Sequence, residues 1–354
     1  MTPHAARKLL CAIALMVWTT SASWALAQAA SGFHVINTIN VDINPFGDAT
    51  SRTDGKIWIA NSGTLSANSN KVTIVNPVNL TESPTKITVG LFPEDIAFTQ
   101  DGGHAFVTNS SDGTVSVVDT QTLTTIQTVN LAPITFPFGV IVNRDDQKVF
   151  VTSDGGNAIV VLDNSNPANV TVKHTIATPG VTGRPVFRPL HRQLLVPSVG
   201  TATPDGPPIL LVVDPVSERV VNQLQLTGNT AFANAITVTP DGNYAYISLF
   251  DFSGGSGGVW VVDLTSLTTI TVINTGDPGV FGMGKSRDGR FVFATNFLAN
   301  TVSVIDTSTN AIVATVPVGK QPNDVTVNLA NTKAFVTNQG DTTVSVISIP
   351  SYDE

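Results

Sequence analysis

Acidic side chains at the start of several short β-branched runs are the residues of this sequence best suited to chemistry. They are Asp48, Glu94, Asp95 and Asp324. Clustered carboxylates with a few neutral oxygens can hold Ca²⁺ or Mg²⁺, and carboxyl groups can act as general acid and general base on a cyclic ester. Arg184 and Arg188 belong to a different unit, and Arg184 could hold an anionic substrate. The four carboxylates are therefore candidate metal ligands, and Glu94, Asp95 and Arg184 are candidate catalytic residues.

A structural role is the alternative for the same residues, and we favour it. Asp and Asn side chains at the start of a strand commonly accept hydrogen bonds from nearby backbone N–H groups. On this interpretation no cofactor is expected, and Ca²⁺ or Mg²⁺ bound by the carboxylates is the competing hypothesis.

Other motifs with chemical associations lack the context that their chemistry needs. Residues Gly279–Ser286 fit G-x-x-x-x-G-K-[ST], but no helical periodicity follows them, and this motif binds phosphate between a strand and a helix. No two histidines are spaced as zinc ligands, and neither C-x-x-C-H nor G-x-S-x-G occurs. The sequence thus carries no motif for zinc, covalent c-type haem or a serine nucleophile.

The elements that must position the candidate residues belong to a repeat. Its best copies are Ala105–Asn109, Val292–Asn296 and Ala334–Asn338, and its weaker copies are 57–61, 149–153, 194–198 and 244–248. Each copy follows a shorter run and precedes two more, and Asp-Gly pairs such as Asp101-Gly102 mark hairpin turns between the first two runs. Each unit of roughly 40–50 residues therefore contains four short β-branched runs.

Such units predict an all-β fold, namely a seven-bladed β-propeller with four antiparallel strands per blade. The seventh unit ends after its third run, near Ser348, and residues 34–41 resemble the fourth run of the sixth unit at 311–318. We expect the N-terminal strand to complete the last blade. Ring closure of this kind leaves no free strand edge.

The repeat resembles the YVTN family of β-propeller repeats, on the motifs quoted above. The resemblance covers all seven units and implies a seven-bladed propeller. The fourth unit departs most, because Leu190-His191 replaces the Asp-Gly pair and Pro197 interrupts the second run. The resemblance implies little about activity, since a fold does not fix a function.

One face of the predicted propeller is the more promising for function. The first strand of each blade lines the central channel, and the loops entering it share a face with the loops between second and third strands; we call this the mouth face. Three insertions fall between second and third strands: Ser62–Asn70, Val199–Pro208 and Leu249–Gly258. Long loops on a rigid scaffold are common binding sites, although tolerated insertions are an equally good explanation.

The residues entering the channel can also be aligned. One column contains Asp48, Asp95 and Asp324 of neighbouring blades, with Arg184 and Arg188 of the fourth unit on the opposite side. Phenylalanines recur on the same face, at Phe46, Phe92, Phe138, Phe232 and Phe281. We expect them to pack between blades rather than to form an apolar site.

The composition limits the classes of partner and the compartment. The 354 residues carry a net charge of −8 with only 12% charged residues, which argues against nucleic-acid binding. Residues 1–27 have the features of a signal peptide: Arg7 and Lys8, an apolar run too short to cross a membrane, and a small-residue site before Gln28. We expect residues 28–354 to form a single exported domain, periplasmic or secreted, monomeric and without a membrane span.

Three functions remain open from the sequence. We favour a non-catalytic exported propeller that binds a protein or small-molecule ligand on the mouth face. The alternative is a lactonase-like hydrolase at the channel mouth, with or without a divalent metal, and a third hypothesis is an accessory to a redox system. Carboxylates that converge around an open funnel would favour the hydrolase, whereas carboxylates bound to backbone N–H groups would favour the binding protein.

Overall fold

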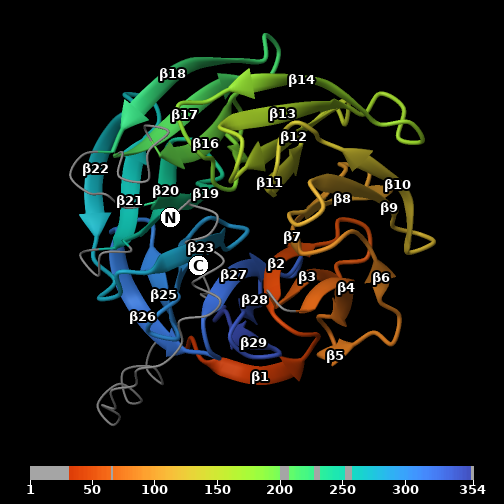
Figure 1. Ribbon diagram of the computed structural model, residues 1–354. Helices are drawn as coiled ribbons and strands as arrows, with labels where there is room; N and C mark the ends of the chain where they lie inside the picture. The colour runs from red at the N-terminus through yellow and green to blue at the C-terminus, as the bar shows by residue number, and fades with distance from the viewer. Residues whose placement is uncertain (1–31, 65–66, 200–206, 227–231, 252–256, 352–354) are drawn as a thin grey trace.

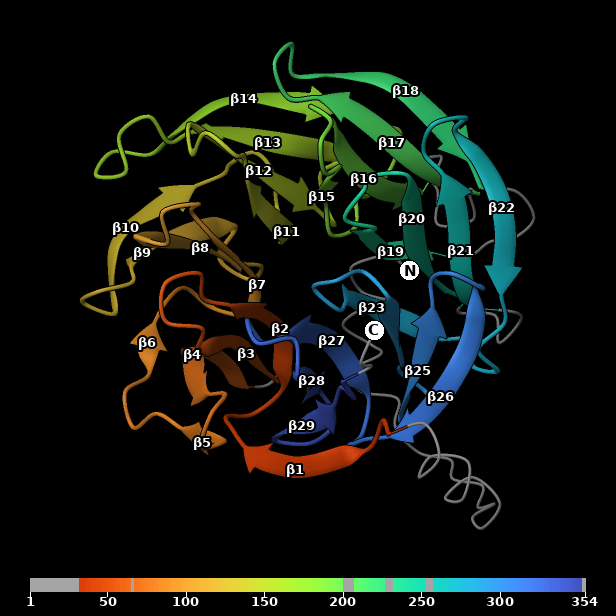
Figure 2. The ribbon, with the colours of Figure 1, turned by 180° about the vertical axis from the view of Figure 1, so that it is seen from behind.

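The computed structural model describes residues 32–64, 67–199, 207–226, 232–251 and 257–351. Seven antiparallel sheets stand around a central axis as blades of a propeller, and the last blade lies beside the first (Figure 1). Seen from behind, the first strand of each blade lies innermost and the last lies at the rim (Figure 2). The predicted seven-bladed β-propeller is thus confirmed. Within the described ranges, no helix is long and apolar enough to cross a membrane.

Each blade contributes one strand to each of four concentric positions, from the axis outward. The innermost strands are β2 (Pro45–Thr50), β7 (Pro93–Phe98), β11 (Pro137–Val142), β15 (Val186–Phe187), β19 (Phe232–Val238), β23 (Val280–Lys285) and β27 (Pro322–Val327). The second strands are β3 (Ile57–Thr64), β8 (His104–Asn109), β12 (Lys148–Ser153), β16 (Leu194–Val199), β20 (Tyr244–Phe250), β24 (Phe291–Asn296) and β28 (Lys333–Asn338). The third strands are β4 (Ala67–Asn76), β9 (Thr114–Asp119), β13 (Ala158–Asp163), β17 (Pro208–Asp214), β21 (Gly258–Asp263), β25 (Thr301–Asp306) and β29 (Thr343–Ser348). The outer strands are β5 (Thr81–Glu82) with β6 (Ile87–Thr88), β10 (Thr124–Asn130), β14 (Thr171–Ala177), β18 (Arg219–Gln225), β22 (Thr268–Ile273), β26 (Ala311–Pro317) and β1 (Val35–Asn40).

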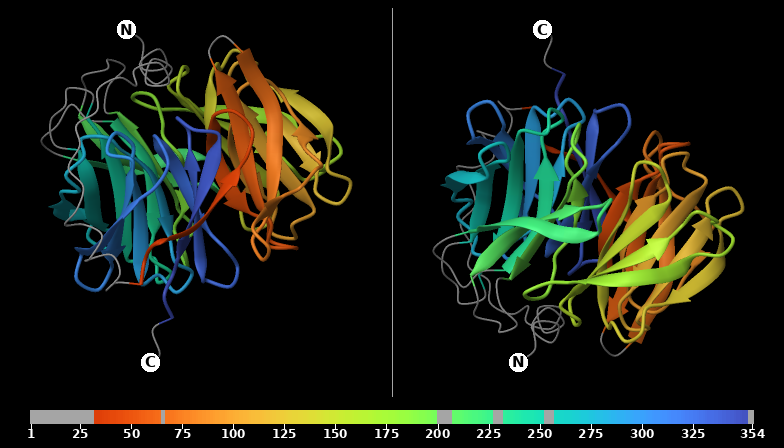
Figure 3. Two further views of the ribbon diagram at one scale, coloured as in Figure 1. Left: turned by 90° about the horizontal axis from the view of Figure 1, so that it is seen from below. Right: turned by 90° about the horizontal axis from the view of Figure 1, so that it is seen from above.

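The hydrophobic core lies between the blades. Seven clusters of buried side chains each join two neighbouring blades. Trp58 of blade 1 packs edge-on against Phe98 of blade 2, with 5.1 Å between ring centroids, and Trp260 of blade 5 packs with Leu195 of blade 4. Side views show the sheets standing face to face around the ring (Figure 3). Because both faces of a blade are covered, its central strands require uncharged residues on both sides.

The threonine of the repeated motif joins neighbouring blades. Six of the seven innermost strands carry one extra residue opposite the second strand, a β-bulge. In blade 2, the Thr108 hydroxyl accepts a hydrogen bond from the N–H of the bulged Asp95 (3.0 Å) and donates one to the Phe138 carbonyl of blade 3 (2.8 Å). The equivalent hydroxyls make the same two contacts in three other blades: Ser248, Thr295 and Thr337.

The asparagine that ends the motif fixes the turn to the third strand. Asn109 Nδ2 donates hydrogen bonds to the hydroxyls of Thr114 and Ser116, both at 3.0 Å. Asn296 and Asn338 make the equivalent pairs of bonds in blades 6 and 7. The recurring T-V-S-V run therefore follows the motif because its Thr and Ser are the partners of this asparagine.

The ring closes as the sequence predicts. Strand β1 pairs with β29, from Val35 opposite Ile347 to Asn40 opposite Thr343, and so supplies the outer strand of blade 7. Just before β1, the ring of Phe33 is fully buried and packs edge-on against Phe291 of blade 6, at 5.0 Å between centroids.

Blade 4 is the irregular one, as its sequence indicates. Its innermost strand β15 has only two residues. Pro197 of β16 takes the position that Thr108 has in blade 2, so blade 4, like blade 1 with Ala60, lacks the hydroxyl that Thr108 provides. A single bridge between Thr182 and Ser198 continues the pairing towards the mouth face.

Candidate functional site

The bulged residues of the six regular innermost strands and Arg184 of blade 4 share one register position. From blade 1 to blade 7 these residues are Gly47, Asp95, Gly139, Arg184, Ala235, Gly282 and Asp324. A Cβ on Gly47 would lie 2.2 Å from the Glu94 carbonyl oxygen and 3.1 Å from Arg184 Nη2. Glycine at this position therefore leaves the space in which the charged side chains of the other blades meet.

The guanidinium of Arg184 lies at the centre of this cluster. Its Nη1 is 2.5 Å from Asp324 Oδ2, and its Nε is 4.0 Å from Asp95 Oδ1. Its Nη2 also donates a hydrogen bond to the Glu94 carbonyl oxygen at 3.4 Å. Arg184 thus reaches from blade 4 to blades 2 and 7, and one cation meets carboxylates from both.

Two of the carboxylates also bind backbone N–H groups. Asp95 Oδ2 accepts a hydrogen bond from Val140 of blade 3 at 2.9 Å. Asp324 accepts one from Val325 at 2.9 Å and one from Asp48 of blade 1 at 3.3 Å. Neither carboxyl oxygen of Asp48 accepts a hydrogen bond of normal geometry from the described residues. Asp95 and Asp324 therefore connect blades through their carboxylates, and Asp48 connects blades 1 and 7 through its backbone N–H.

Burial dominates the electrostatics of the cluster. It raises the pKa of Asp95 to about 6, although the Arg184 cation acts against the shift. Burial and the neighbouring Asp324 raise the pKa of Asp48 well above its ordinary value. Burial raises the pKa of Asp324 as well, again opposed by Arg184. Desolvation works against the Arg184 cation, but the surrounding carboxylates raise its pKa and keep it charged.

Phenylalanines cover the cluster on the mouth side. The rings of Phe46 and Phe138 lie 5.6 and 5.5 Å from the Arg184 guanidinium carbon, within cation–π distance. Phe46 packs edge-on against Phe138 (6.2 Å) and Phe281 (6.1 Å), which come from blades that do not adjoin blade 1. The full cluster, which we call the aromatic plug, contains Phe46, Phe138, Val181, Val199, Phe232, Phe250, Phe281 and Phe297. These side chains are buried and close the channel at its mouth.

The plug corrects part of the sequence interpretation. Four of the five aligned phenylalanines do come together, but they pack across the channel as well as between blades. Phe92 is buried and is not part of the plug. Phe250 and Phe297, which belong to it, were missed, although Phe297 directly follows its motif copy and Phe250 lies two residues beyond its own.

The structure brings Asp48, Asp95, Asp324 and Arg184 together, with one difference in register. Asp48 occupies the position that Ile96 has in blade 2, one residue beyond the column of Asp95 and Asp324. The alignment from sequence placed it within that column. Gly47 takes the bulge instead, and a shift of one residue in a strand turns the side chain to the other face.

The side chain of Arg188 is not at the channel mouth, contrary to expectation. Its Nε donates a hydrogen bond to the Gly242 carbonyl oxygen at 2.7 Å, in the turn between the first two strands of blade 5. Glu94 is buried beside the cluster, and its charge contributes to the raised pKa of Arg184. The segment Gly279–Ser286 contains β23 and leads into β24, so a strand and not a helix follows the phosphate-loop pattern.

The cluster offers little to a divalent cation. Ca²⁺ binds six to eight oxygens, whereas here a guanidinium lies against the Asp324 and Asp95 carboxylates. In the described ranges no group of three or more His, Cys, Asp or Glu side chains is placed to hold a metal ion. The cluster instead links five blades. Arg184 of blade 4 and its carboxylate partners make contacts with blades 1, 2, 3 and 7.

The fold and the axial cluster define a seven-bladed β-propeller with a plugged centre, in which one buried arginine meets carboxylates from other blades. The chain belongs to the YNCE-like β-propeller family, whose model matches residues 5–353. No curated protein matches the sequence. Among solved structures, Kuenenia stuttgartiensis hydrazine synthase is similar at 19% identity and a TM-score of 0.76, over 88% of this chain and 97% of that chain. The β-propeller domain of Myceliophteria thermophila Cps50 (Swd1) is similar at 10% identity and a TM-score of 0.69, over 90% of this chain and all of that chain. At these identities the similarity shows the fold alone.

Proposed function

We propose that the protein is an exported, non-catalytic propeller that binds a partner protein or a small ligand on its mouth face. The observation that carries this proposal is the unequal length of the connections between second and third strands. Four blades have four-residue connections: 110–113, 154–157, 297–300 and 339–342. Blades 4 and 5 have longer ones, 200–207 and 251–257. Chain added on one face of a rigid ring is the usual way to build a binding surface.

Blade 1 adds to the same face by a different route. Its second and third strands have eight and ten residues, against six in each of the equivalent strands of blade 2. The extended hairpin leans on the neighbouring blade, where Asn68 Nδ2 donates a hydrogen bond to the Ser111 hydroxyl at 3.2 Å. Its Thr64, Ala67 and Asn68 are exposed, which makes them available to a partner.

The contacts at the axis support binding rather than catalysis. A general acid or base must reach its substrate, and here Asp95 and Asp324 are buried, hydrogen-bonded to backbone N–H groups and covered by the aromatic plug. The raised pKa of Asp95 follows from burial, and structural charge networks produce such shifts as well as active sites do.

Loop exchange tests the proposal. In one variant, residues 200–207 and 251–257 are each replaced by the four-residue connection Ser110–Gly113. The matched control replaces residues 339–342 with the same four residues, on the same face and without a change of length. Thermal-shift screening with small molecules and affinity capture from the cell envelope are then compared. We expect a ligand or partner that the control retains and the shortened variant loses while its Tm is kept; equal binding by both, or none by the wild type, would overturn the proposal.

The hydrolase alternative has its own test. Hydrolysis of a panel of lactones is measured with and without Ca²⁺ or Mg²⁺, for the wild type and Asp95→Ala. On the proposal above, neither chain hydrolyses them; metal-stimulated hydrolysis lost in the variant would establish the hydrolase instead.

Export is part of the proposal and rests on the N-terminal sequence, since residues 1–27 lie outside the described part of the chain. The N-terminal sequence of the protein recovered from the periplasm or medium should begin at Gln28. An uncleaved chain in the cytoplasm would contradict this.

A further inference from the structure

A cavity lies between blades 3 and 4, at the end of the propeller opposite the aromatic plug. It has a volume of about 580 Å³, within the usual range for small-molecule sites. Three turns form its walls, namely 143–147 between β11 and β12, 188–193 between β15 and β16, and 215–218 between β17 and β18. The two-residue β15 and the irregular turn that follows it both lie at this junction, and Phe187 of β15 lines the cavity.

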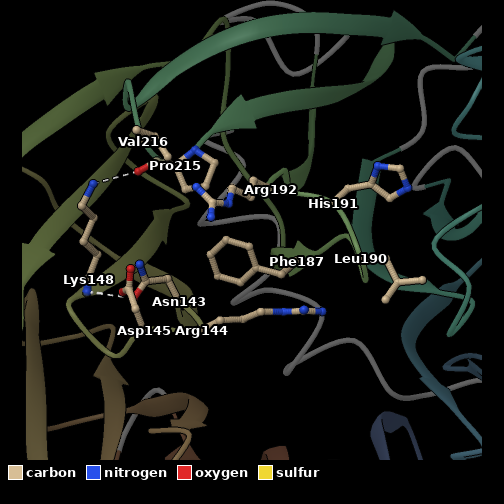
Figure 4. A pocket seen from close by; sticks show the side chains of 10 residues that line it. All are labelled: Asn143, Arg144, Asp145, Lys148, Phe187, Leu190, His191, Arg192, Pro215 and Val216. Carbon is tan, nitrogen blue, oxygen red and sulfur yellow. Dashed lines mark hydrogen bonds between the residues drawn. The ribbon is translucent and has the colours of Figure 1, made fainter.

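Basic side chains surround the cavity, although the chain as a whole is acidic. Arg144, Lys148, His191 and Arg192 line it, against the single carboxylate of Asp145. Lys148 is already used, because its Nζ contacts Glu218 Oε1 at 2.5 Å and donates to the Pro215 carbonyl at 2.8 Å (Figure 4).

Arg144 and Arg192 are exposed, and their guanidinium groups have no partner within the described residues: neither makes a hydrogen bond or an ion pair. Arg287, at the position equivalent to Arg144 in blade 6, donates hydrogen bonds to the carbonyl oxygens of Asn328 (2.8 Å) and Val327 (3.3 Å) of the next blade. At the junction of blades 3 and 4, Arg144 is therefore free to bind a ligand, whereas Arg287 of blade 6 is bonded to the next blade.

The cavity also has an apolar wall. The half-buried ring of Phe187 is seen between the side chains of Arg144 and Arg192 (Figure 4), and it is held from below by Phe150, edge-on at 5.9 Å. Leu190 and Val216 complete the wall and are 75% and 65% exposed.

Leu190 has an unfavourable backbone conformation. It has φ of +60°, a conformation that favours glycine and costs a β-carbon-bearing residue free energy. It follows Pro189 in a tight turn closed by the His191 N–H and the Arg188 carbonyl oxygen at 3.3 Å. Because the Leu190 side chain is exposed, it gains little from the core, and a ligand in the cavity would cover it.

We propose that this cavity binds a small organic anion with an apolar body. Arg144 and Arg192 would hold its carboxylate or phosphate oxygens, for which the guanidinium fork is well matched. Phe187 and Leu190 would cover its hydrocarbon part. The site is separate from the mouth face, and the proposal does not depend on the function proposed above.

Calorimetric titration with defined probes tests the proposal. The probes are 4-phenylbutyrate and phenyl phosphate, with the neutral 4-phenylbutanamide and inorganic phosphate as controls. We expect at least one anionic aromatic probe to bind with a Kd of about 1 mM or tighter, and both controls to bind at least about tenfold more weakly. The tighter of the two anionic probes identifies the acid group. No binding of either one, or equal binding of the amide or of inorganic phosphate, would overturn the proposal.

Variants distinguish this cavity from other basic surface. Arg144→Gln and Arg192→Gln should each weaken binding about tenfold or more. Arg52→Gln is the matched control, because Arg52 is exposed at the equivalent position in the turn of blade 1; it should leave binding unchanged. Equal loss in Arg52→Gln would place the probe elsewhere and overturn the assignment.

Leu190→Gly separates binding from folding. The variant should keep or raise Tm, because glycine suits the positive φ, and yet weaken binding of the aromatic probe severalfold. Unchanged probe affinity in this variant would contradict a role for Leu190 in the site.

Discussion

Replacement of Arg184 should lower the stability of the propeller strongly. Its guanidinium faces the buried carboxylates of Asp324 and Asp95, so Arg184→Met leaves buried charges without a counterion. Breaking a buried ion pair from one side typically costs about 3–5 kcal/mol, and we expect a loss of that size in the free energy of unfolding measured with denaturant. Asp48→Asn is the control: it removes a carboxyl without a normal hydrogen bond and should be neutral or stabilising at neutral pH. Equal stability of Arg184→Met and the wild type would show that the cluster contributes nothing.

The pH dependence of stability should reflect the raised pKa of Asp95. Because the folded-state pKa of about 6 lies above the ordinary 3.8, this group's contribution is complete at low pH and is lost as the pH rises through about 6. Tm should therefore be higher near pH 5 than near pH 7.5 by calorimetry. Asp95→Asn should reduce this difference without abolishing it, because the raised pKa values of Asp48 and Asp324 act in the same direction. Glu218 has a lowered pKa. Its contribution to stability is therefore lost only as the pH falls below the pKa of an ordinary glutamate, which lies outside the range from pH 5 to pH 7.5. A Tm that rises steadily towards pH 7.5 would contradict the expectation.

Residue types and spacing predicted which side chains meet at the axis, but not how they meet. Asp95, Asp324 and Asp48 could be found because each follows the same turn before an innermost strand. The bulge that displaces Asp48 by one position has no sequence signal of its own, since it depends on the pairing with the second strand. The reach of Arg184 across the channel depends on the closed ring and on the missing side chain at Gly47, which only the assembled blades reveal.

The motif threonine should contribute to stability through its hydroxyl. Thr108 is fully buried, accepts a hydrogen bond from Asp95 N–H and donates one to the Phe138 carbonyl of the next blade. Thr108→Val keeps the shape of the side chain but leaves both partners without a hydrogen bond. It should lower the free energy of unfolding, measured with denaturant, by about 1–3 kcal/mol. Thr128→Val, on the exposed face of the outer strand of the same blade, should change stability by less than about 0.5 kcal/mol. Similar values for the two variants would mean that the two hydrogen bonds of the Thr108 hydroxyl contribute nothing to stability.

The strands were predictable because each has the same pattern in seven copies, with β-branched runs ending at turn residues. The element that deviates is also visible in sequence: Leu190-His191 and Pro197 mark blade 4 as irregular. What the pattern could not predict is that this irregularity shortens β15 and exposes a basic cavity. That outcome depends on two turns far apart in the chain, 143–147 and 215–218, and on the absence of carbonyl partners for Arg144.

At the scale of the whole molecule, the low charge content follows from the architecture. Each of seven junctions buries one apolar cluster, and the eighth cluster closes the channel. Stability is thus distributed around the ring, so no single blade can be removed without exposing two apolar faces. Blade 7 differs from the other six, because its sheet joins β1 to strands from the opposite end of the described chain.

Ring closure by the N-terminal strand is therefore the test of this architecture. Strand β1 contacts three blades: it pairs with β29 of blade 7, Phe33 before it packs on blade 6, and Ile39 within it packs on blade 1. A chain that begins at Asp42 should lose more stability than Phe33→Ala, for which about 3–5 kcal/mol is expected, and should expose the edge of β29 to association. A chain that begins at Gly32 is the matched control and should keep its Tm. Added peptide 32–41 should raise the Tm of the shortened chain in proportion to the logarithm of its concentration, because it binds only the folded ring. If the chain from Asp42 melts at the temperature of the control, β1 does not close the ring and the stability must come from the other six junctions alone.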